Sequence, residues 1–210
     1  MPPPDLEHPF PTLEASLKKA VAALRDSQIP FLLAGSLAVW ARGGPETRND
    51  LDFLVKREDA DRALDVLELA GMRPEKPPEE WLYKAWDGDI LIDLIFHPRG
   101  MEVTDEVIGR GDVLHVLGIT IPVMSIEDVL ATKLLALHEH ELDYSAVVRI
   151  ARAVREQIDW RYLRERTARS PYATAFFVLC EELGIVGGEQ GQRGAHVRVL
   201  TPLQGADPSH

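Results

Sequence analysis

The spacing of apolar residues divides the chain into a part of mixed structure and a helical part. In residues 12–28 apolar positions recur every three or four residues, which predicts an amphipathic helix. Short apolar runs bounded by glycine, proline or aspartate then predict strands. Single strands are expected at residues 31–35, 50–55, 81–86 and 89–96, and two short strands around Gly118 at residues 112–125. Two helices are expected between these runs, at residues 36–42 and 58–71.

Beyond residue 125 the apolar spacing is helical. It predicts helices over roughly 126–140, 144–156, 159–169 and 172–184, whereas residues 74–80, "PEKPPEE", are expected to form a loop. The fold class is therefore α/β (α+β), with a mixed sheet followed by helices. We expect three parts: a core over residues 1–125, a helical region over residues 126–184 and a flexible tail over residues 185–210.

Composition and charge narrow the possible settings and partners. Hydrophobic residues make up 45% of the chain and charged residues 27%, an ordinary globular balance. The sequence has one cysteine and no apolar run of the roughly 20 residues that a bilayer requires. The start "MPPPDLEHPFP" also lacks the basic and apolar regions of a secretion signal. We therefore expect a cytoplasmic protein with no membrane partner.

A formal net charge of -11 argues against a protein that coats nucleic acid by bulk attraction. Residues 149–169 are the exception, because seven arginines fall in this segment. They either form a landing surface for an anionic partner or belong to a solvated helical face, paired with nearby acids.

Candidate chemistry begins with two aspartates on one predicted strand. Asp50 and Asp52 are two residues apart, so their side chains should point to the same face. Two adjacent carboxylates repel each other and are best tolerated around a cation. Oxygen ligands without nearby cysteine or histidine favour magnesium or manganese. The alternative is a polar strand end that faces water.

A third carboxylate lies in the apolar run "ILIDLIF". Asp93 is flanked there by Ile92, Leu94 and Ile95, and burial of a lone carboxylate is unfavourable unless it is paired or bound to metal. Three aspartates on neighbouring strands could hold two cations for an in-line phosphoryl displacement. A hydrogen-bonded structural acid is the alternative interpretation.

Three further features complete the candidate set. Gly35-Ser36 stands between an apolar strand and a helix start, where backbone N–H groups suit a phosphate. Lys133 falls inside the apolar stripe of its helix, so it either extends to solvent or reaches a charge in a cleft. Arg48, just ahead of the aspartates, is either a phosphate contact or a surface residue.

Gly35-Ser36, thirteen residues, Asp50-Leu51-Asp52 and a later Asp93 together resemble the signature of the DNA polymerase beta-type nucleotidyltransferase superfamily. The stretch "IPVMSIEDVLATKLLALHEHELDYSAVVRIA" is similar to a segment of small bacterial nucleotidyltransferases, among them AbiE- and MenT-type toxin–antitoxin enzymes. The resemblance covers about residues 12–160. It implies that residues 1–125 form the catalytic core.

The resemblance also implies roles. Gly35, Ser36 and Lys133 would contact the triphosphate of a nucleoside triphosphate such as ATP. Asp50, Asp52 and Asp93 would bind Mg²⁺ or Mn²⁺, and Asp93 would also accept the proton of the attacking hydroxyl. Asp143 either matches a later acidic position of the family or caps the next helix.

The toxin-like enzymes imply an RNA acceptor, tRNA above all, and an antitoxin protein as partner. In this chain, however, "HEHELD" carries His138 and His140 where the toxin enzymes often have arginine or lysine before the late aspartate. The acidic charge favours a second acceptor class, small molecules such as aminoglycosides. A nucleotide-binding or partner-binding protein without catalysis is the third hypothesis.

Overall fold

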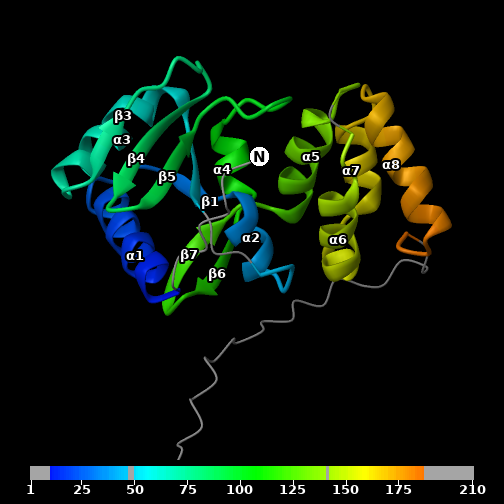
Figure 1. The fold of residues 1–210 in the computed structure, drawn as a ribbon, viewed down its shortest axis with the longest axis horizontal. Coiled ribbons are helices and arrows are strands. Elements are labelled where there is room, and N and C mark those ends of the chain that lie inside the picture. Colours follow the sequence, from blue (N-terminus) through cyan, green and yellow to red (C-terminus); the bar gives the residue numbers. More distant parts are fainter. Residues whose placement is uncertain (1–9, 47–49, 141, 187–210) are drawn as a thin grey trace, which may run out of the picture.

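A computed structural model of the chain describes residues 10–46, 50–140 and 142–186. Its centre is a seven-stranded mixed sheet, which confirms the predicted fold class (Figure 1). The strands β1 and β7 are parallel, as are β2 and β5, and the remaining neighbours are antiparallel. From one edge to the other the order is β3 (Arg73–Glu75), β4 (Leu82–Asp87), β5 (Ile90–Ile95), β2 (Leu51–Val55), β1 (Phe31–Leu33), β7 (Ile119–Val123) and β6 (Asp112–Val116).

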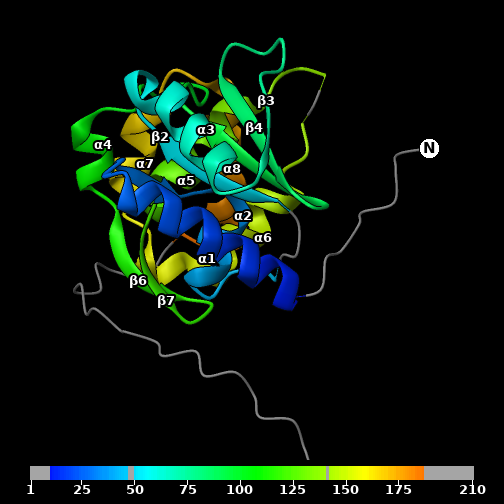
Figure 2. The same ribbon diagram turned by 90° about the vertical axis from the view of Figure 1, so that its left-hand side faces the viewer.

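Helices stand on both sides of this sheet. The outer face is covered by α1 (Phe10–Asp26) and by α3 (Ala60–Leu69), which follows the 3₁₀ helix η1 (Arg57–Asp59) (Figure 2). On the other side lie α2 (Gly35–Ala41), α4 (Asp105–Gly109), α5 (Ile126–Ala136), α6 (Ser145–Val154), η2 (Arg155–Gln157), α7 (Trp160–Arg166) and α8 (Pro171–Glu182). Within the described residues, no helix combines the length and apolar character needed to cross a bilayer.

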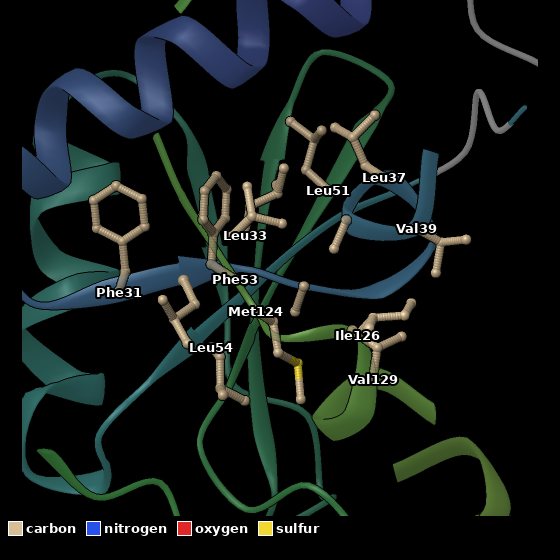
Figure 3. Packing of buried hydrophobic residues seen from close by; sticks show 14 of the residues in the cluster. Phe31, Leu33, Leu37, Val39, Leu51, Phe53, Leu54, Met124, Ile126 and Val129 are labelled. Atoms are coloured by element: carbon tan, nitrogen blue, oxygen red, sulfur yellow. The ribbon is translucent and has the colours of Figure 1, made fainter. Parts of the chain in front are cut away.

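The core joins the central strands to the helical region. On the outer face the rings of Phe31 and Phe53 meet edge to face, with centroids 5.6 Å apart. Figure 3 shows that the apolar cluster continues from β1 and β2 through Leu37 of α2 to Ile126 and Val129 of α5. Burial of this continuous cluster stabilises the position of α5 relative to β2.

One buried ion pair also fixes the helical region. Asp128 of α5 is 1% exposed and accepts hydrogen bonds from the guanidinium of Arg110, which follows α4. Arg166 at the end of α7 approaches the same carboxylate to 3.9 Å. A single buried carboxylate therefore connects α4, α5 and α7.

Several predicted boundaries are wrong. The helix expected over 126–140 ends at Ala136, because Leu137 takes an extended backbone. The segment predicted as a loop from residue 74 overlaps β3, and α4 was not predicted although Thr104 caps it. Ile185, the first residue of the predicted tail, is buried and its N–H donates to the carbonyl of Cys180 at 2.8 Å, while the tail itself stays a prediction. Residues 187–210 of that tail lie outside the described residues.

Candidate functional site

A row of charged side chains crosses four strands. Glu75 of β3 pairs with Lys84 of β4, Lys84 with Asp93 of β5, and Asp93 with Asp52 of β2. Residues directly opposite each other on neighbouring strands point to the same face of a sheet. Asp87, three positions after Lys84, accepts hydrogen bonds from α1, so Lys84 faces away from α1. The row therefore lies on the face opposite α1, toward the helical region.

The backbone at the start of α2 lies directly against the side chain of Asp52. Gly35 has φ +60°, and a Cβ added there would lie 1.7 Å from Asp52 Oδ2. The Ala34 N–H donates to the Asp52 carbonyl oxygen at 2.8 Å, which extends the β1–β2 pairing to this point. Only glycine fits both the conformation and the space. Gly35 was expected just before a helix that begins at Ser36, but α2 begins one residue earlier, at Gly35.

Asp52 is the electrostatic centre of the site. Burial raises its pKa to about 7, and the negative charges of Asp93 and Asp50 add to the effect. The positive charges of Lys133 and Lys84 act in the opposite direction. One detail differs from the prediction, since Asp50 precedes β2 instead of lying on it. The charge of Lys133 acts on Asp52, as the cleft alternative expects, and its role toward a triphosphate stays a prediction. The structure thus brings Asp50, Asp52, Asp93 and Lys133 into one electrostatic field.

Sequence reasoning missed Lys84, whose Nζ lies 3.3 Å from Asp93 Oδ1. Both side chains are largely buried, with 24% and 14% exposed. Burial raises the pKa of Asp93, and the charge of Lys84 partly offsets this increase. The hairpin loop is Gly88-Asp89, which pairs Lys84 with Asp93. The sequence prediction placed this turn one residue earlier, at Asp87-Gly88.

Asp143, the remaining predicted residue that the structure describes, does not join this group. Asp143 is exposed and its carboxylate accepts a hydrogen bond from the Ser145 N–H at 2.8 Å, at the start of α6. That contact corresponds to the helix-capping alternative. Arg48 lies outside the described residues, and its role stays a prediction.

The donor set fits a divalent cation by its chemistry. Carboxylate oxygens are the ligands that Mg²⁺ and Mn²⁺ prefer, and a cation would relieve the repulsion that raises the pKa of Asp52. Among the residues that the structure describes, however, no three His, Cys, Asp or Glu side chains are grouped closely enough to hold one ion. Asp93 engages Lys84 instead, so the carboxylates surround the site without forming a ready-made cage.

Comparison with known protein families assigns the chain to one of them. The sequence model of a family described as uncharacterised nucleotidyltransferase matches residues 12–181, which is most of the chain. No curated protein matches the sequence.

Three solved structures are similar to the chain, and the first of them shares its fold. The solution structure of the antibiotic-resistance factor ANT(2'')-Ia is similar with a TM-score of 0.55 and 16% identity, covering 82% of this chain and 97% of that one. A nucleotidyltransferase of Thermotoga maritima gives a TM-score of 0.49 at 17% identity, over 61% of this chain and 87% of its own. The lincosamide antibiotic adenylyltransferase LnuA gives 0.48 at 16% identity, over 65% and 93%.

Proposed function

We propose, since the chain belongs to the family of uncharacterised nucleotidyltransferases, that it transfers a nucleoside monophosphate to a hydroxyl group of a small cationic molecule. The observation that carries the proposal is the position of Asp52, between the Gly35 backbone on one side and Asp93 on the other. The close-fitting backbone at the start of α2 and the two neighbouring carboxylates support the proposal.

The reaction would be an in-line displacement. The acceptor oxygen forms a bond to the α-phosphorus, the bond from that phosphorus to the bridging oxygen breaks, and pyrophosphate leaves. Asp93 accepts the hydroxyl proton. Asp50, Asp52 and Asp93 would hold Mg²⁺ or Mn²⁺, which neutralises charge on the phosphate oxygens when bound. Gly35, Ser36 and Lys133 would orient the triphosphate, so the work of the chain is positioning and charge neutralisation.

Three observations favour a small cationic acceptor over tRNA. The net charge of -11 attracts cations. One protein that shares the fold is an antibiotic-resistance factor. The arginines of the C-terminal helices are also partly neutralised by acids: Arg155 by Glu156, Arg161 by Glu165 and Arg164 by Glu181. A landing surface for an RNA backbone would instead leave such guanidinium groups available for phosphates.

The test is label transfer from each of the four nucleoside triphosphates, labelled at the α-phosphate, in the presence of Mg²⁺ or Mn²⁺. Acceptors are total RNA and a panel of polycationic, hydroxylated small molecules that includes aminoglycosides. We expect a low-mass, nuclease-resistant labelled product with the wild type and none with Asp52→Asn. Asp61→Asn is the matched control, because Asp61 is an exposed aspartate paired with Lys76 on the far side of the sheet.

The outcomes separate the hypotheses. Label that appears only in RNA would retain nucleotidyl transfer and exclude the small acceptor; an antitoxin partner would then be sought. Calorimetric binding of nucleotide without label in any fraction would favour a non-catalytic nucleotide-binding protein. The absence of both binding and transfer would refute the proposed function.

A further inference from the structure

The row across the sheet contains one cation that the proposed chemistry does not use. Lys84 stands between Glu75 on β3 and Asp93 on β5, with its Nζ 3.3 Å from Asp93 Oδ1. Glu75 is engaged elsewhere, since one of its carboxylate oxygens accepts a hydrogen bond from Trp86 Nε1 at 2.8 Å. Asp93 is therefore the partner to which the Lys84 ammonium group is committed.

An ammonium group and a divalent cation cannot both use a carboxylate without repelling each other. At a few ångströms and in a partly buried setting this repulsion is substantial, because water screens it weakly. Within the described residues no three such carboxylates are grouped closely enough to hold one ion, and Asp93 is the one that Lys84 holds. Metal binding must therefore compete with the Lys84 contact.

We propose that Lys84 is a positioning residue that holds Asp93 and competes with the divalent cation for it, which lowers the metal affinity of the protein without nucleotide. The inference rests on the proposed function. Asp93 stays fixed in the row by the ammonium group until a bound metal supplies the stronger charge. The site would then favour metal that arrives together with the negatively charged triphosphate, whose charge offsets that of Lys84.

The experiment measures Mn²⁺ binding to the nucleotide-free protein, from the electron paramagnetic resonance signal of free Mn²⁺. Lys84→Met should lower the dissociation constant by about three- to tenfold, since it removes the competing charge. Lys84→Arg retains the charge and should bind like the wild type. Lys76→Met is the control, because this substitution also removes an ammonium group, but from an exposed ion pair with Asp61.

A gain of affinity separates this role from structural support, because loss of a mere support would weaken metal binding. Lys84→Gln carries the same expectation should Lys84→Met fail to fold. Equal or weaker Mn²⁺ binding in the folded Lys84 variant would overturn the inference and leave the proposed function intact. No Mn²⁺ binding in any nucleotide-free variant, the folded Lys84→Met included, would also overturn the inference, whereas the label-transfer experiment alone decides the proposed function.

Discussion

The backbone of Gly35 lies directly against the carboxylate of Asp52: a Cβ on Gly35 would come within 1.7 Å of Asp52 Oδ2. The junction between β1 and α2 therefore packs directly against β2, although fifteen residues lie between Gly35 and the start of β2 in the sequence. Any side chain at position 35 must displace the carboxylate or the start of α2.

Gly35→Ala should reduce nucleotidyl transfer by about a hundredfold or more, since a misplacement of about 1 Å is enough for such a loss. Gly88→Ala is the matched control, because Gly88 has φ +62° and nothing within 4 Å of its added Cβ. Gly88→Ala should lower the free energy of unfolding by about 1–2 kcal/mol through the left-handed backbone alone. Gly35→Ala should lower it further, because its Cβ also collides with the Asp52 carboxylate. Only Gly35→Ala should lose activity, and equal activity in the two variants would contradict the assigned contact.

Asp52→Asn should stabilise the metal-free protein at neutral and higher pH. The folded pKa of Asp52 is about 7 and the unfolded value is 3.8. Between these values the folded state keeps a proton that the unfolded state has lost, so the free energy of unfolding falls as the pH rises. Above pH 7 the substitution should therefore add up to about 4 kcal/mol, and near pH 4 very little.

Thermal unfolding from pH 4 to 8 in the presence of a chelator measures this dependence. Asp61→Asn is the control, since a hydrogen bond from Lys76 lowers the pKa of Asp61 and gives no such penalty. If the effect of Asp52→Asn did not depend on pH, the pKa of Asp52 in the folded protein would not be raised.

The sequence was sufficient to find the apolar strands and the aspartates on or beside them, because each depends on local pattern. Asp52 and Asp93 alternate with buried neighbours, and this period-two burial fixes their face. Lys133 could also be found, since a lysine within an apolar helical stripe is an anomaly that local reasoning detects.

Lys84 could not be found in the same way, because its role depends on hairpin register. A loop at Gly88-Asp89 sets Lys84 opposite Asp93, whereas a loop one residue earlier would set Leu82 there. Both placements fit the turn residues, and only the packing of the sheet decides between them. The short edge strand β3 could not be predicted either, since a three-residue strand containing Pro74 has no periodicity to recognise.

Lys133→Met should raise the pKa of Asp52 above its value of about 7 in the metal-free protein. The positive charge of Lys133 stabilises the ionised carboxylate, so its removal favours the protonated form. Titration of the Asp52 carboxyl carbon by NMR, with a chelator present, measures the shift. Lys133→Arg keeps the charge and should leave the pKa near the wild-type value. An unchanged pKa in Lys133→Met would place Lys133 outside the site.

Asp128→Ala should destabilise the protein by about 3 kcal/mol, because it leaves the guanidinium of Arg110 without its buried partner. Glu106→Ala is a sharp control. Glu106 pairs with the same guanidinium at 3.2 Å, but its side chain is 84% exposed. Water screens this second pair, and its loss should change stability by less than about 1 kcal/mol.

Chemical denaturation of the two variants measures the difference directly. A larger loss of stability in Asp128→Ala than in Glu106→Ala would show that the buried carboxylate joins α4, α5 and α7. Loss of any one acidic partner of Arg110 would then not be sufficient. Since α5 also carries Lys133, partial loss of this connection should appear at the distant site as well. Asp128→Ala should therefore move the pKa of Asp52 in the same direction as Lys133→Met, whereas Glu106→Ala should leave it unchanged.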